Sequence, residues 1–163
     1  MLKKWLALAL LLCGTGLVVV ALVGRKTDEE RIIEQLVLLE QLLGYEAPPN
    51  ILQRTATLNG GFGELLTETA RLHVPERGLH AQGKPDIVRL AAQGTLGMNR
   101  FLVQFDDIGV ELTGPNARVT TRIDLEAQVG SEPRRDERGA TLHFVLSDGE
   151  WLIDAATVHS DAE

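Results

Sequence analysis

Histidines are the side chains of this sequence best suited to proton transfer near neutral pH. The chain contains four of them: His73, His80, His143 and His159. The hydrophobic residues at 142, 144 and 146 alternate around His143, so if they face a core His143 faces away from it. An inward His143 would instead be placed to act as an acid or a base. The other three histidines lack the spacing of metal-ligand motifs, and we expect no metal site.

Two adjacent carboxylates, Asp106 and Asp107, are the next residues that would suit acid–base chemistry. They interrupt an alternating strand just before Gly109, a pattern typical of a β-bulge. Asp154 alternates with Trp151 and Ile153 and should lie on the opposite face of its strand. We therefore predict no catalytic residue and no cofactor.

About three helices are expected in the first part of the domain, the second of them in two stretches. Thr27 and Glu30 form a capping box ahead of a 3–4-spaced hydrophobic stripe that ends at Gly44. Asn50 should cap a helix over 51–58, and Gly60, Gly61 and Gly63 read as a hinge before a second helical stretch over 62–72. The glycines are not a phosphate loop, because no Lys-Ser/Thr follows and no strand precedes them. Another helix should begin at Lys84, because a proline such as Pro85 is favoured in the first turn of a helix.

Strands dominate the remainder. Pro75 interrupts an irregular segment over 73–82, which should therefore be an edge strand. Two long alternating strands are predicted, one over 101–112 and one over 118–129, and a turn at Pro115 joins them. Residues 131–139 (SEPRRDERG) are expected to form a solvated loop, and two final strands flank the Asp148-Gly149 turn. Helices followed by a meander of strands indicate an α+β fold.

This order resembles the nuclear transport factor two-like superfamily, which includes SnoaL-like cyclases and ketosteroid isomerase. The resemblance covers roughly residues 27–159. It rests on Gly83-Lys84-Pro85 before the third helix, the turn at Gly114-Pro115-Asn116, and the stretch Asp148-Gly149-Glu150-Trp151-Leu152-Ile153. It implies a cone-like curved antiparallel sheet packed on about three N-terminal helices, as a domain spanning 27–160.

The resemblance also implies where a ligand would bind, namely inside the cone. The side chains proposed for the pocket wall are Phe101, Phe105, His143, Phe144 and Trp151. Isomerase-like members use a tyrosine with a carboxylate, but the one tyrosine here, Tyr45, stands at the end of the first helix. An Asp-Arg-Asp constellation is also missing, because Arg118, Arg122 and Asp124 should face outward.

An uncharged apolar run, from Trp5 to Val23, precedes this domain. A helix of that length spans roughly the ~30 Å hydrocarbon core of a bilayer. We predict a short basic tail at 1–4, a transmembrane signal anchor at 5–24, and a single-pass protein of a bacterial inner membrane with a periplasmic domain. A cleaved signal is the alternative, and so is a lipoprotein at Cys13, although Leu12 fits a lipobox poorly. Cys13 is the single cysteine, which excludes an intrachain disulfide.

Charge limits the partners. After residue 26 the chain has 12 basic and 23 acidic residues, so we expect no nucleic-acid partner. The prediction is a membrane-anchored, noncatalytic domain that binds a protein partner, a second copy of itself or a small apolar ligand. Alternatives are a SnoaL-like or isomerase-like enzyme acting on an apolar substrate, with His143 or Asp107 inside the cone, and an exported lipid-binding protein with a cleaved signal.

Overall fold

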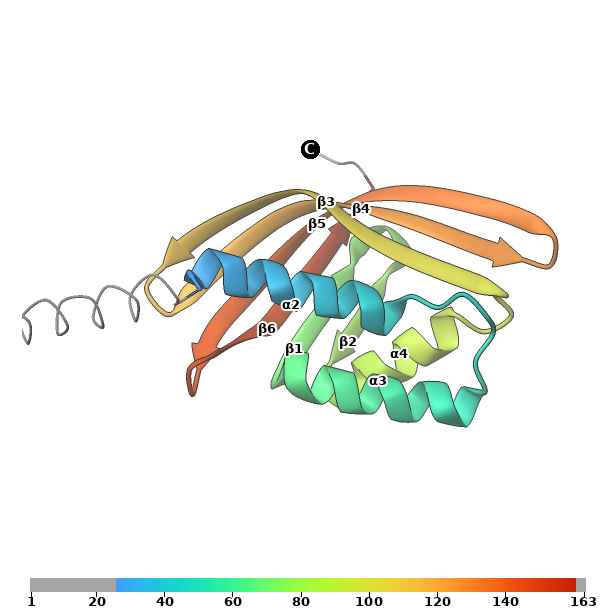
Figure 1. The fold of residues 1–163 in the computed structure, drawn as a ribbon, viewed down its shortest axis with the longest axis horizontal. Helices are drawn as coiled ribbons and strands as arrows, with labels where there is room; N and C mark the ends of the chain where they lie inside the picture. Colours follow the sequence, from blue (N-terminus) through green and yellow to red (C-terminus); the bar gives the residue numbers. More distant parts are fainter. Residues whose placement is uncertain (1–25, 161–163) are drawn as a thin grey trace, which may run out of the picture.

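The structure, a computed structural model, describes residues 26–160 as helices packed against one face of a curved sheet (Figure 1). The helices are α2 (Asp28–Leu43), α3 (Ile51–Leu65) and α4 (Lys84–Gly94), with a 3-10 turn η1 at Pro75–Arg77. The strands are β1 (Leu66–Val74), β2 (Leu79–Gln82), β3 (Arg100–Thr113), β4 (Asn116–Val129), β5 (Glu132–Ser147) and β6 (Glu150–His159). The predicted α+β architecture, with three helices on a curved sheet, is confirmed.

The first helix begins and ends where its sequence signals predict. The amide of Glu30 donates to the Thr27 hydroxyl, and the Glu30 carboxylate accepts from the Thr27 amide. The stripe that includes Ile32, Leu36 and Leu39 is buried, and Gly44 is the C-cap. Local capping and a 3.6-residue period were therefore sufficient to define α2.

The predicted glycine hinge between two helical stretches is wrong. α3 runs without a break from Ile51 to Leu65, through Gly60, Gly61 and Gly63. A helical glycine costs only about 1 kcal/mol relative to alanine, which packing can offset. Gly61 allows α2 to approach closely, because a Cβ placed there would collide with the Leu42 side chain.

The sheet has the order β2-β1-β6-β5-β4-β3, and one of its pairings is parallel. β1 runs parallel to β6, whereas the other neighbouring strands are antiparallel, so the all-antiparallel prediction is corrected at this pair. The stretch predicted as helix up to residue 72 is mostly β1, because pairing with both β6 and β2 satisfies its backbone. Pro75 starts the turn between β1 and the edge strand β2.

Residues 132–139 are strand rather than loop. They extend β5 and pair with the end of β4, for example Arg135 opposite Glu126, whose side chains lie 2.7 Å apart as an ion pair. Cross-strand charges of opposite sign favour such a solvated ribbon. The bulge between Asp106 and Gly109 is confirmed, with Asp107 at φ 52°.

The core lies between the helices and the inner face of β3–β6. Its most buried side chains include Ile32, Leu36, Phe144 and Trp151. Trp151 Nε1 donates to Asp28 Oδ1 at 3.0 Å, which ties the closing hairpin to the first turn of α2.

The predicted transmembrane anchor lies outside the described residues. Among residues 26–160, no helix is both long enough and apolar enough to cross a membrane.

Candidate ligand-binding site

An apolar cavity of about 210 Å³ lies between the helices and the inner face of the sheet. α2, α3 and α4 contribute one wall, and inward-facing residues of β1, β3, β4, β5 and β6 contribute the other. Its lining consists of Leu39, Leu43, Phe62, Leu66, Ala70, Arg71, Leu72, Ile87, Leu90, Ala91, Phe105, Ile123, Ala140, Leu142, Ile153, Ala156 and Val158. Small residues such as Ala140 and Ala156 leave the space open.

Arg71 is the one residue of this lining that is not hydrophobic. Its side chain is 64% exposed, and Nη2 lies 3.2 Å from Asp154 Oδ2. Asp154 Oδ1 also accepts a hydrogen bond from the Thr67 hydroxyl at 3.0 Å. The guanidinium is thus occupied by a neighbouring carboxylate at the solvent side, and the cavity can hold a ligand mainly through apolar contact.

The five residues proposed for the pocket wall do not lie together in the structure. Phe105 lines the apolar cavity, whereas Phe144 and Trp151 are each 1% exposed and packed in the core. Phe101 lies beside Tyr45 at the start of β3, with ring centroids 6.3 Å apart. His143 is exposed on the opposite face of the sheet. Contact of any of them with a ligand stays a prediction.

The groups considered for catalysis do not meet in the cavity. Asp107 is absent from the lining, and its Oδ2 lies 2.5 Å from Arg122 Nη1. The Tyr45 hydroxyl donates to the backbone carbonyls of Thr95 and Met98. Among residues 26–160, no group of three His, Cys, Asp or Glu side chains is placed to hold a metal ion.

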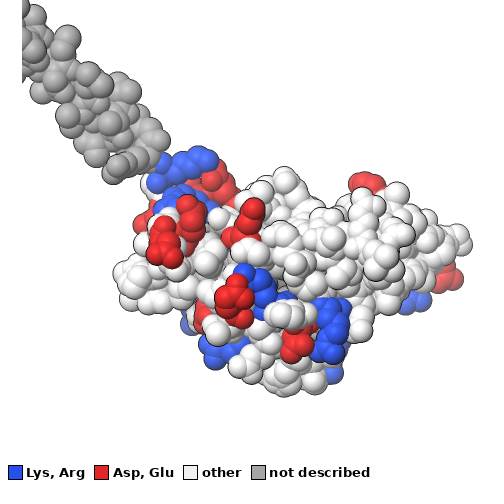
Figure 2. Space-filling model, turned by 90° about the horizontal axis from the view of Figure 1, so that it is seen from below, with Lys and Arg blue, Asp and Glu red and all other residues white. Residues whose placement is uncertain are grey.

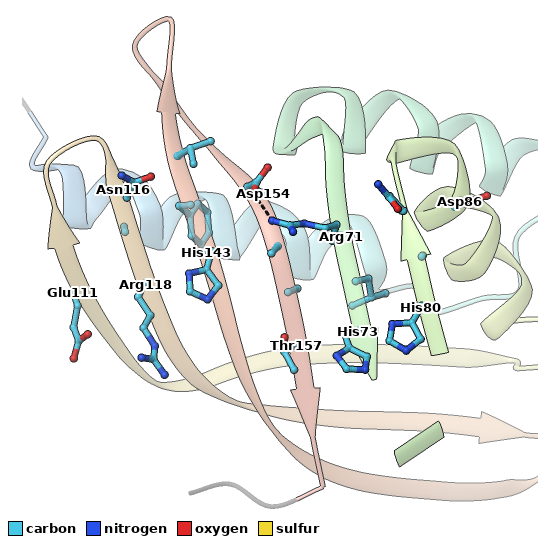
Figure 3. Close-up of a pocket in the computed structure, with 18 of the residues that line it drawn as sticks. Arg71, His73, His80, Asp86, Glu111, Asn116, Arg118, His143, Asp154 and Thr157 are labelled. Carbon is cyan, nitrogen blue, oxygen red and sulfur yellow. Dashed lines mark hydrogen bonds and ion pairs between the residues drawn. The ribbon is translucent and has the colours of Figure 1, made fainter. Parts of the chain in front are cut away.

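A second hollow of about 910 Å³ lies on the outer face of the sheet, and Asp86 in the first turn of α4 stands at its border. Figure 3 shows polar side chains in a row across consecutive strands: Arg118 on β4, His143 on β5, Thr157 on β6, His73 on β1 and His80 on β2. We call this hollow the outer groove.

Strand register explains the two parts of the row, which are offset from each other because His143 lies opposite Ala155 and Thr157 lies opposite Thr141. Arg118 is the cross-strand neighbour of His143, Thr157 is that of His73, and His73 is that of His80. The imidazoles of His73 and His80 stack with centroids 4.1 Å apart. Sequence reasoning missed this grouping, although two histidines on either side of the turn at Pro75 were a signal for a cross-strand pair.

Comparison with solved structures identifies the architecture. An NTF2-like protein from Cytophaga hutchinsonii superposes with a TM-score of 0.63 at 13% identity, over 83% of this chain and 100% of that chain. A candidate scytalone dehydratase from Novosphingobium aromaticivorans gives 0.66 at 12% identity, over 82% and 84%. The domain has the nuclear transport factor two-like fold. A protein from Salmonella enterica described as a member of the NTF2-like superfamily gives a TM-score of 0.64 at 13% identity, over 81% of this chain and 89% of that chain.

These identities establish the fold alone, since this fold is shared by proteins with unrelated activities. No protein-family model matches the sequence, and no curated protein matches it with significance. Function must therefore be argued from the two hollows.

Proposed function

We propose that this chain is a membrane-tethered, noncatalytic domain that binds a small apolar ligand in the cavity between its helices and its sheet. The observation that carries the proposal is the cavity itself, which is open, apolar and bordered by a single charged residue already paired with Asp154. A cavity without a free acid or base favours binding over acid–base chemistry.

The size of the cavity indicates the size of the ligand. An apolar cavity of ~150 Å³ in another protein stays dry and binds benzene. The 210 Å³ found here therefore suits one substituted aromatic ring or a short stretch of alkyl chain. Contacts with so few atoms predict weak binding, with a Kd on the order of 1 mM or somewhat tighter for a minimal probe.

The tether is proposed from the apolar run 5–23. A single-pass anchor in a bacterial inner membrane, with the domain in the periplasm, would keep the cavity close to lipid-soluble ligands. An intact amino terminus found by mass spectrometry, together with retention of the chain in carbonate-washed membranes, would support the anchor. A mature chain that begins after the apolar run would contradict it.

The distribution of charged side chains argues against a nucleic-acid ligand. Figure 2 shows lysine and arginine side chains interspersed with aspartate and glutamate, without a continuous basic surface on the face drawn. A nucleic acid would need such a surface.

An enzyme acting on an apolar substrate is the alternative. It requires an acid or base in the cone, and the proposed groups, His143 and Asp107, lie outside the cavity lining. The candidate scytalone dehydratase shares the fold, but at 12% identity it lends no catalytic residue to this chain.

A pair of adjacent substitutions tests the proposed site. Ala140→Leu places a larger side chain in the cavity, and Thr141→Leu places the same side chain on the opposite face of β5. With toluene at ten times its Kd, the free energy of unfolding of the wild-type chain should rise by about 1.4 kcal/mol. Thr141→Leu should show the same rise and Ala140→Leu none, all measured on the full chain in lipid nanodiscs. Equal effects in the two variants would refute the site.

A further inference from the structure

The outer groove is rich in hydrogen-bond donors that have no partner within the described chain. No side-chain hydrogen bond or ion pair in residues 26–160 engages its row of donors, which comprises Arg118, His143, Thr157, His73 and His80. Arg118, His143 and His80 are exposed, and the other two are half-buried. An arginine offers five N–H groups, and each imidazole offers one N–H when neutral and two when protonated.

The acids of the groove are mostly occupied. Asp154 accepts from Thr67 and Arg71, and Asp86 accepts from Arg89 at 2.8 Å. Glu111 is the cross-strand neighbour of Arg118 on the edge strand β3, but no ion pair joins their side chains. The groups of the groove that lack a side-chain partner are therefore mainly donors, which complements a ligand made of acceptors.

Small side chains form the floor of the groove. Ala155 lies in register between His143 on β5 and Arg71 on β1, so β6 presents only a methyl group there. The longer side chains of His143 and Arg71 stand on the two neighbouring strands (Figure 3). His143 and His73 are separated by two strand spacings and by an offset of two residues along the strands, which together amount to ~12 Å.

We propose that the outer groove binds a small dicarboxylate. Arg118 and His143 donate to the carboxylate at one end, and His73 and His80 donate to the carboxylate at the other. The Thr157 hydroxyl lies between the two ends, and the connecting chain crosses the floor at Ala155. Arg71, Leu72 and Ala156 border both hollows, but the five donors line only the outer groove, so neither proposal depends on the other.

Isothermal titration of the full chain in nanodiscs with adipate tests the proposal, with hexane-1,6-diol as the uncharged probe of the same chain length. We expect adipate to bind and the diol not to bind. Arg118→Gln and the double variant His73→Asn/His80→Asn should each weaken adipate binding by about fivefold or more, the scale of one or two lost charge-assisted hydrogen bonds. His159→Asn, which changes the histidine outside the groove, should leave binding unchanged.

Ala155→Leu provides an independent variant, because it places a larger side chain on the floor of the outer groove and removes no hydrogen-bond donor. It should abolish adipate binding while toluene still stabilises the chain, which separates a failure here from a failure of the apolar site. The proposal is overturned if the wild-type chain does not bind adipate, if the diol binds equally well, or if Arg118→Gln binds adipate as tightly as the wild type. A crystal structure that shows a second copy covering the groove would also overturn it.

Discussion

Arg54 is a buried cation that holds the end of one helix against the next. It is 6% exposed, and its two terminal nitrogens donate to the carbonyls of Leu42 and Leu43 at 2.8 Å and 2.6 Å. Burial lowers the pKa of this guanidinium, and the partial negative charge at the C-terminus of α2 favours the cation. The Tyr45 ring lies 5.2 Å from the guanidinium carbon.

Replacing this side chain should be costly. Arg54→Met leaves two partly buried carbonyls without donors and should lower the free energy of unfolding by about 2–4 kcal/mol. Arg54→Lys should recover only part of the loss, because an ammonium lacks the planar fork that reaches both carbonyls. Urea titration of the full chain measures both. A loss below about 0.5 kcal/mol for Arg54→Met would rule out the capping role.

Trp151 and Asp28 offer a second test at this scale. Trp151→Phe removes the hydrogen bond to Asp28 and part of a fully buried ring, so stability should fall by about 1–3 kcal/mol. Asp28→Asn keeps an acceptor for the indole and should cost less. Urea titration distinguishes the two, and equal losses would mean that the hydrogen bond contributes little.

Single residues were harder to place from sequence than their strands were. Alternation assigned Phe105 and Phe144 to the inner face and His143 to the outer face correctly. It could not show that Phe105 borders a cavity while Phe144 is sealed in the core. That difference depends on how far the helices stand from the sheet, which no local pattern encodes.

At the level of elements, α3 contains three glycines in different surroundings. A Cβ at Gly60 or Gly63 would meet nothing within 4 Å, whereas one at Gly61 would collide with Leu42. Gly60→Ala and Gly63→Ala should therefore raise the free energy of unfolding by about 0.5–1 kcal/mol each, through higher helix propensity. Gly61→Ala should leave the free energy of unfolding unchanged or lower it, because the Leu42 side chain must move.

Chemical denaturation of the three variants makes this comparison directly. Each substitution adds the same methyl group to the same helix, so Gly60→Ala and Gly63→Ala serve as matched controls for Gly61→Ala. If all three variants gained equal stability, the close contact between α2 and α3 would not exist as described.

Elements with strong local signals were predictable, and elements that depend on pairing were not. The caps of α2, the proline at the start of α4, the bulge at Asp107 and the turn at Gly149 all follow from nearby residues. β1 becomes a strand because β6, about 80 residues later, lies beside it. The charged start of β5 likewise becomes ordered through its pairing with β4.

Over the whole molecule, one sheet separates two different environments. Its inner face and the helices enclose an apolar cavity, and its outer face carries a row of hydrogen-bond donors. β6 contributes to both, because its side chains alternate between the two faces. The sequence predicted the fold and the apolar interior, but the outer groove became visible only when the strand register was known.

The isoleucine δ1-methyl NMR spectrum of the full chain in nanodiscs, recorded with and without toluene, tests the central proposal most directly. Ile87, Ile123 and Ile153 line the cavity, whereas Ile32 is sealed in the core and Ile51 is exposed. Occupation of the cavity predicts chemical-shift changes at the three lining methyls, little change at Ile32 and Ile51, and no such pattern in Ala140→Leu. Changes at Ile51 without changes at the lining residues would contradict ligand binding between the helices and the sheet.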